Sequence, residues 1–430
     1  MDYRFVQGSG GSFQNGGNWQ PRGVPGSGDV ALFEGWQTAP QPVAGPATVG
    51  KLRFLAGPQG YDLTGRFTTT GIASVGTEVN NTAVRLMPGT RLTTGKLVVA
   101  NGGTVDDDQG GAGTVLTTGS TVISSGTATA ALVFSELRLT ENATWDNGGN
   151  VIVHPWGDFS IAAKVAVTIG GDLRIGALGS DSPGTAPPAS ASVLELSSLT
   201  VGHDVVLGDG ADFAVGQSDV AIAGKVAVLG GGEFDLNEAP GSHASVSIAV
   251  VTLSPRASFV GNLGTLTGPG AAGSTVYNQG TISVPESFTI DGSVYDHGAI
   301  LLGQQLSTGN LTVTGSLWSQ SITFVTAGSH LVVGAFGGGD SIHGFVPGDT
   351  LFEPDLVGIN YDSAEHLLTL LQTGGRSEVL HMVGDFSGER FVLKANGVVR
   401  VLAASAGSMS ATEGTVASSP AALLHSVHLT

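Results

Sequence analysis

The sequence predicts an all-β protein: a single-stranded parallel β-helix (β-solenoid) with an N-terminal cap and a C-terminal antiparallel β module. Three observations carry this prediction. The chain of 430 residues contains 68 glycines, about twice the usual share. Short β-branched segments alternate with Gly, Asn, Asp and Ser, whereas helical periodicity is nearly absent. Finally, segments of the chain repeat at offsets near 20 residues, which is typical of the turns of a solenoid.

The clearest repeat predicts a ladder of aromatic residues. Val276-Tyr277-Asn278 returns as Val294-Tyr295-Asp296 after 18 residues and, more weakly, as Leu317-Trp318-Ser319 after a further 23. Because one coil cannot bury its own apolar face, repeats of this length stack on one another. We therefore expect Tyr277, Tyr295 and Trp318 to occupy successive rungs of one structural ladder. The pattern leaves open whether the rings point inward or outward.

A second repeat supports the same architecture. Lys, an apolar residue, a small apolar residue and Val precede a Gly-Gly pair in segments that begin at Lys96, Lys164 and Lys225. The offsets of 68 and 61 residues each correspond to about three coils. A series of β-sandwiches would repeat the hydrophobic pattern alone, whereas these repeats share the chemistry of their corners, which favours the solenoid.

Changes in composition and in the pattern of strands and turns divide the chain into four parts. Residues 1–48 are rich in Pro and Gly and are expected to form an N-terminal cap in which Trp19 and Trp36 cover the end of the core. Residues 49–336 form the solenoid. Residues 337–402 carry hairpin signals, including an Asn-Gly turn, and are expected to form the C-terminal β module. Residues 403–430 are a small-residue tail that we expect to be flexible.

Charge and composition exclude several classes of partner. The net charge is −18 and Lys and Arg are not clustered, so nucleic acid is not an expected partner. No apolar segment is long enough to span a membrane as a helix, and the first residues lack the pattern of a classical signal peptide. The absence of cysteine excludes disulfides and thiolate metal sites.

Both ends of the chain resemble secreted β-solenoid surface proteins of Gram-negative bacteria, of the autotransporter-passenger or type I secreted kind. At the N-terminal end the resemblance lies in Asn18-Trp19, Val24-Pro25 and Gly28-Asp29, followed by an apolar strand. At the other end it lies in residues 340–375 and 384–397, and the tail with Ala422-Leu423-Leu424 resembles an uncleaved C-terminal secretion signal. The resemblance implies a secreted or cell-surface location.

Because parallel β-helices also house polysaccharide lyases and glycosidases, the acidic residues are candidates for catalysis. A glycosidase needs two carboxylates about 5 to 9 Å apart. The candidates are Asp204, Asp209 and Asp212, which follow His203, or Asp291 with Asp296. The competing interpretation, which we favour, is that these side chains satisfy the backbone of turns, as Asp commonly does.

Calcium and glycans are the two candidate ligands of the chain. The sequence indicates no organic cofactor, but carboxylates are ligands that Ca²⁺ prefers. The calcium candidates are Asp106, Asp107, Asp108 and Asp340. Trp145 and Trp156 are candidates for glycan binding, since they flank an irregular segment and aromatic rings stack on sugars.

The function that these patterns predict is structural or adhesive. We expect an exported, non-enzymatic solenoid of the bacterial cell surface or extracellular matrix, which assembles with copies of itself into a homo-oligomer, filament or layer, or adheres to surface glycans. The alternative is a carbohydrate-active enzyme, either a lyase or a glycoside hydrolase, or a glycan-binding module on the same fold.

Overall fold

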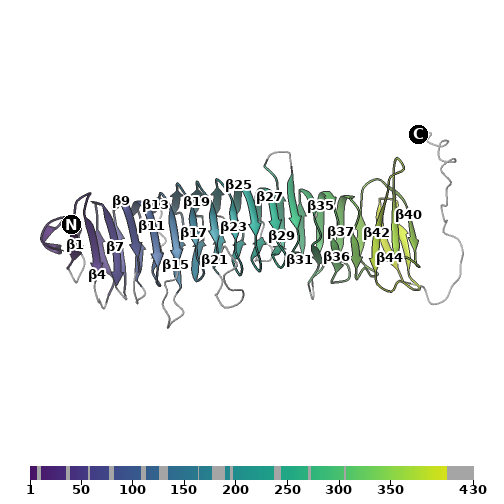
Figure 1. Cartoon of the computed structure of the whole chain (residues 1–430), viewed down its shortest axis with the longest axis horizontal. Helices are drawn as coiled ribbons and strands as arrows, with labels where there is room; N and C mark the ends of the chain where they lie inside the picture. The colour runs from purple at the N-terminus through teal and green to yellow at the C-terminus, as the bar shows by residue number, and fades with distance from the viewer. Residues whose placement is uncertain are drawn as a thin grey trace.

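The protein is a parallel β-solenoid of about 12 turns in a computed structural model. Its coils stack side by side along one long axis, with β1 (Asp2–Phe5) at one end and the C-terminal strands at the other (Figure 1). At about 4.8 Å per rung, twelve turns give a rod of roughly 60 Å. The structure describes residues 1–6, 11–34, 39–56, 59–76, 82–107, 113–124, 134–162, 164–176, 189–193, 197–236, 244–269, 273–304 and 307–403.

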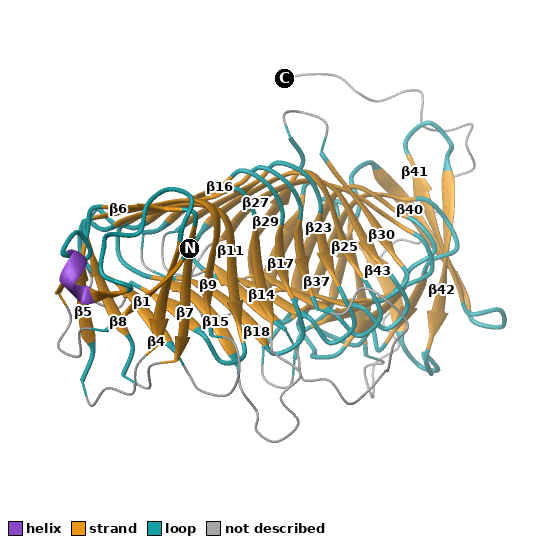
Figure 2. Ribbon diagram, turned by 60° about the vertical axis from the view of Figure 1, so that its left-hand side comes forward, coloured by secondary structure: helices purple, strands orange, loops and turns teal. Residues whose placement is uncertain are grey.

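A short 3-10 helix, η1 (Gly16–Asn18), lies near the N-terminal end of the solenoid (Figure 2). Two sheets form the walls of the solenoid. Sheet A, with 26 strands, contains β1, β3 (Trp19–Gln20), β4 (Val30–Glu34), β6 (Ala47–Val49), β7 (Lys51–Ala56), β9 (Arg66–Val75), β11 (Arg91–Ala100), β13 (Val115–Thr118), β14 (Thr121–Ser124), β16 (Thr144–Asn147), β17 (Val151–Val153), β19 (Ala166–Ile169), β20 (Leu173–Ile175), β22 (Ser198–Val201), β23 (Val205–Leu207), β25 (Asp219–Val228), β27 (Ala244–Leu253), β29 (Leu263–Thr267), β30 (Ser274–Asn278), β32 (Ser287–Ile290), β33 (Gly292–Tyr295), β35 (Asn310–Leu317), β37 (His330–Phe336), β39 (Thr350–Phe352), β43 (Arg390–Leu393) and β44 (Val398–Leu402). Sheet B contains β2 (Gly11–Ser12), β5 (Gln41–Ala44), β8 (Tyr61–Thr64), β10 (Ala83–Leu86), β12 (Thr104–Asp106), β15 (Ser135–Leu139), β18 (Gly157–Ile161), β21 (Ser190–Val193), β24 (Asp212–Val215), β26 (Glu233–Leu236), β28 (Ser258–Gly261), β31 (Thr281–Val284), β34 (Ala299–Leu302), β36 (Ser321–Phe324), β38 (Ser341–His343), β40 (Leu356–Asp362), β41 (Leu367–Gln372) and β42 (Ser377–Val383).

A typical coil contributes two consecutive segments to sheet A and one to sheet B. In the coil of β13, β14 and β15, the corner between the two sheet A strands is Gly119-Ser120. In β9, β11, β25 and β27 the two segments run together as one strand of 10 residues. Side chains alternate between the core and the outer surface along each strand, as the period of two requires.

The core is continuous along the rod and is filled by aliphatic and aromatic residues. Phe213, Phe234 and Phe259 lie on consecutive rungs of sheet B, are fully buried, and have ring centroids 5.4 and 5.5 Å apart. At the N-terminal end the buried Trp19 packs against Phe5 and Phe13, and its indole N–H donates to the carbonyl of Phe13 at 2.9 Å. Trp36, the other predicted cap residue, lies outside the described residues.

The parallel stack extends beyond the predicted boundaries at residues 48 and 336. On the N-terminal side β4 already pairs in parallel with β7, and β5 with β8, so the segment predicted as a cap contains solenoid strands. On the C-terminal side β38 stacks on β36 and β39 on β37, which carries the solenoid to Phe352.

The C-terminal antiparallel module follows this last coil. Strands β40, β41 and β42 form an antiparallel meander, and β43 and β44 form the hairpin predicted at Asn396-Gly397. The module extends both sheets of the solenoid. In sheet B, β42 pairs in parallel with β38, and in sheet A, β44 pairs antiparallel with β39.

Candidate functional site

The predicted aromatic ladder lies on the outer surface of sheet A, which answers the question that the sequence left open. Tyr277 is directly opposite Tyr295 in the register of β30 and β33, and their ring centroids are 5.9 Å apart. Val294 pairs with Leu317, so Trp318 occupies the next rung. Tyr277 and Trp318 are 43% and 44% exposed, respectively, and Tyr295 is partly exposed. We call these three residues the outer ladder.

The direction of the outer ladder follows from strand alternation. Val276, Val294 and Leu317, the residues before the three aromatic ones, are completely buried. Their neighbours along the strands must therefore point out. At the end of the ladder the ring of Trp318 lies against the backbone of Gly337, where a Cβ atom would collide with the indole.

The corner beside the outer ladder is held by two buried amides that the sequence analysis missed. Asn278 is fully buried, and its amide donates to Gln320 Oε1 at 2.9 Å and to the carbonyl of Ala299 at 3.1 Å. The Gln320 amide in turn donates to the carbonyls of Asp296 and Trp318 at 2.5 and 2.8 Å. These bonds span the three coils that carry the aromatic rings, and thus fix the rungs relative to one another.

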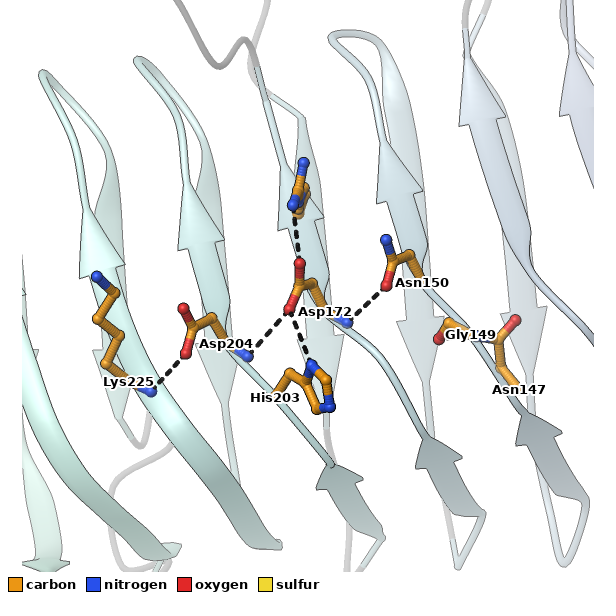
Figure 3. Close-up of polar contacts among 8 residues, drawn as sticks. Asn147, Gly149, Asn150, Asp172, His203, Asp204 and Lys225 are labelled. Atoms are coloured by element: carbon orange, nitrogen blue, oxygen red, sulfur yellow. Dashed lines mark hydrogen bonds and ion pairs between the residues drawn. The ribbon is translucent and has the colours of Figure 1, made fainter.

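A second ladder is polar and runs along the corner between the two sheet A segments (Figure 3). The backbone N–H of Asp172 donates to Asn150 Oδ1 at 2.9 Å, the N–H of Asp204 donates to Asp172 Oδ1 at 3.3 Å, and the N–H of Lys225 donates to Asp204 Oδ1 at 3.0 Å. Each side chain thus satisfies a backbone donor of the next coil. We call these four residues the corner ladder.

Asp172 shows how charge is balanced in the corner ladder. Its carboxylate bonds to Arg174 at 2.8 Å, and His203 Nδ1 lies 3.9 Å away. Partial burial raises the pKa of Asp172, but the hydrogen bonds from Arg174 and from the N–H of Asp204 outweigh it and hold the pKa below its usual value. Asp172 is therefore a charged structural acceptor.

The structure does not bring the three catalytic candidates together. Asp204 and Asp209 flank opposite ends of β23, a strand whose three residues span about 10 Å. Asp204 accepts the N–H of Lys225, and Asp209 accepts the N–H of Gly231 at 2.6 Å, so both satisfy corner backbone. Asp212 begins β24 on sheet B and lies in register with Glu233. Asp204 and Asp209 therefore act as acceptors for turn backbone, which is the interpretation that the sequence analysis favoured over a catalytic cluster with Asp212.

The two tryptophans proposed for glycan binding have different environments. Trp145 is 0% exposed, packs on Phe159 with ring centroids 5.2 Å apart, and donates to the Thr118 hydroxyl at 2.9 Å. The prediction that Trp145 binds a sugar is wrong, because neither face of its ring reaches solvent. Trp156 is half-buried and makes an edge contact with the exposed Phe134, so this pair does reach the surface.

The calcium candidates lie in separate places. Asp107 is buried and accepts both the N–H and the hydroxyl of Thr140; burial raises its pKa. Asp106 lies between Arg85 and Arg138 in the register of sheet B. Asp340 is far along the chain, before β38, and Asp108 lies outside the described residues. Across the described parts of the chain, no three acidic or histidine side chains are close enough to hold one metal ion.

One polar groove of about 330 Å³ lies at the carboxyl ends of the sheet B strands β26, β28, β31 and β34. Its lining residues carry two carboxylates, two carboxamides and a hydroxyl, together with two aliphatic side chains. They are Asp235, Val260, Asn262, Pro285, Glu286, Gln304 and Ser307. The groove thus offers hydrogen-bond acceptors and donors on successive coils. Sequence reasoning did not find it, because its residues come from four coils.

Comparisons with known proteins add no assignment. No family model, curated protein or solved structure matches the chain. Among the described residues, no helix is long and apolar enough to cross a membrane.

Proposed function

We propose that the protein is an exported adhesive rod of the bacterial cell surface or extracellular matrix, and that the outer ladder is its contact surface. The single observation that carries this proposal is the exposure of Tyr277 and Trp318, which lie two coils apart in one register-locked stack with Tyr295 between them. Tyr and Trp are enriched at binding surfaces because they offer a large apolar area together with a polar group.

The rod itself supports an adhesive role. A ladder attached to one flexible loop would lose conformational entropy on binding, whereas the outer ladder is already ordered by strand pairing and by the Asn278–Gln320 amide bond. A solenoid of about 12 turns also holds its surface at a distance from its ends. The predicted self-assembly would pair the outer ladders of two copies and bury their rings.

A glycan is the second candidate for the contact, and the polar groove favours it. The carboxylates of Asp235 and Glu286 can accept hydrogen bonds from sugar hydroxyls, and the amides of Asn262 and Gln304 can both donate and accept. The outer ladder lies at the other end of β31 and β34, so its aromatic rings would stack on a different sugar unit of the glycan. In this alternative the protein is a glycan-binding module.

The test removes the exposed rings and keeps the fold. In the double variant Tyr277→Ser with Trp318→Ser we expect loss of self-assembly, seen by negative-stain electron microscopy and sedimentation, or loss of retention on a glycan array. The matched control is Val357→Ser, which removes an apolar side chain that is 64% exposed in the C-terminal module. Undiminished assembly and glycan retention in the double variant would contradict the proposal.

The enzyme alternative has its own readout. If the protein is a lyase or glycosidase, the purified wild-type chain will cleave acidic polysaccharides. Such cleavage would replace the adhesive proposal.

A further inference from the structure

The junction between the last coil and the C-terminal module contains three carboxyl groups. Glu353 directly follows β39 of the last coil and is 0% exposed. Asp340 precedes β38 and is 2% exposed. Glu378 belongs to β42 of the module and is partly buried. Carboxyl groups from both sides of the junction therefore lie in one largely water-free place.

Hydrogen bonds connect these groups across the junction. The amide of Gln372, on β41 of the module, donates to Glu353 Oε1 at 2.5 Å and to Glu378 Oε1 at 3.3 Å. The backbone N–H of Phe336, at the end of β37, donates to Glu353 Oε1 at 3.3 Å. On the solenoid side, Asp340 Oδ1 accepts the N–H of Gln320 at 2.7 Å. One oxygen of each carboxyl group is thus satisfied.

The second oxygen of each group lacks a donor. Glu353 Oε2, Glu378 Oε2 and Asp340 Oδ2 are all buried and have no hydrogen-bond partner among the residues that the structure describes. Glu353 and Glu378 also lie side by side, because both accept from the same nitrogen, Gln372 Nε2. Two facing carboxylates would repel, whereas a single proton between them supplies the missing donor and removes one charge.

We propose that Glu353 and Glu378 share one proton and form an acid-dependent latch that holds the C-terminal module on the last coil. The proton satisfies both buried oxygens and joins β39 of the coil to β42 of the module. When the proton leaves, two buried like charges face each other across the junction and the module loosens. Loosening exposes the edges of β38 and β39, which β42 and β44 otherwise cover.

Burial of the three carboxyl groups determines the direction of the pH dependence. Burial, followed by the charge of Glu378, raises the pKa of Glu353 to about 7, and burial raises the pKa of Asp340 to about 6. Burial also raises the pKa of Glu378, although the nearby Arg376 acts in the opposite direction. The folded junction therefore holds more protons than the unfolded one between the ordinary glutamate pKa and about 7. Its stability falls as the pH rises through that window and is constant above it.

Hydrogen exchange of the full chain tests the latch. The backbone amides of β42 and β44 report opening of the module, and amides of β23, far from the junction, serve as an internal reference. After correction for intrinsic exchange, we expect opening to increase by about a hundredfold between pH 5 and pH 8. A wild-type profile that is flat over this range would overturn the proposal.

Two variants separate the latch from other effects of pH. Glu353→Gln cannot ionise, and its amide can donate to Glu378, so the change over the same range should fall to no more than about tenfold, the part that Asp340 contributes. Glu378→Gln should behave similarly and serves if the first variant does not fold. Glu365→Gln, an exposed position in the β40–β41 turn, is the matched control and should keep the full dependence. If both latch variants retain the wild-type profile, the latch is excluded.

Discussion

Two aromatic ladders in this molecule have almost the same spacing, but one faces the core from sheet B and the other faces solvent from sheet A. Phe213, Phe234 and Phe259 stack inside, with ring centroids 5.4 and 5.5 Å apart. Tyr277 and Tyr295 stack outside at 5.9 Å. The similar distances follow from parallel pairing, which places equivalent residues of successive coils one rung apart. What differs is burial, and burial determines whether a ladder stabilises the fold or remains free to bind.

Removing an inner ring should have the largest effect on stability. Phe234 is fully buried and has an aromatic ring on both sides, Phe213 stacked and Phe259 tilted. Phe234→Ala removes the ring and leaves a cavity, so we expect a loss of about 3 to 5 kcal/mol in the free energy of unfolding, measured by chemical denaturation. A loss below about 1 kcal/mol would mean that neighbouring coils collapse into the space, and that the inner ladder is not a rigid core.

Removing a side chain of the corner ladder should lower the free energy of unfolding by less than removing an inner ring and by more than removing an outer ring. Asp204 accepts the N–H of Lys225, so Asp204→Ala leaves that donor to water and should cost about 1 kcal/mol in the same denaturation experiment. Asp204→Asn keeps an acceptor oxygen and should stay within about 0.5 kcal/mol of the wild type. Equal losses in both variants would show that the charge of Asp204, and not its acceptor oxygen, supports the corner.

The solenoid could be predicted from the sequence, but the phase of its repeats could not. The repeats carry both hydrophobic alternation and corner residues, which are local signals. However, the segment at Lys164 is out of phase with the other two. Its Gly170-Gly171 pair lies at the corner between two sheet A strands, whereas Gly102-Gly103 and Gly231-Gly232 lie between sheet A and sheet B. The same chemistry serves both corners, so the motif alone does not distinguish them.

Buried amides explain why the sequence misplaced Trp145 at the surface and left the direction of the Tyr277 ring open. Trp145 is followed by Asn147, which suggests a surface segment, yet Asn147 is fully buried and accepts from Thr118 and Thr121. Likewise Tyr277 is followed by Asn278, whose buried amide is satisfied by Gln320, a residue two coils away. A polar residue in the core disturbs the alternation that would reveal which neighbour points out. Its partner is distant in sequence, so the pattern cannot show it.

Shortening the middle rung of the outer ladder should have the smallest effect on stability. Tyr295 is partly exposed and lies between Tyr277 and Trp318, so Tyr295→Ala should cost no more than about 1 kcal/mol in the denaturation experiment. The same change splits the contact surface into two isolated rings, and we therefore expect it to weaken self-assembly or glycan retention. Tyr295→Phe keeps the stack and removes only the hydroxyl, so it should retain contact if ring stacking provides the affinity. If Tyr295→Ala instead destabilises the chain as much as Phe234→Ala does, the outer ladder is part of the structural core, and the distinction between the two ladders fails.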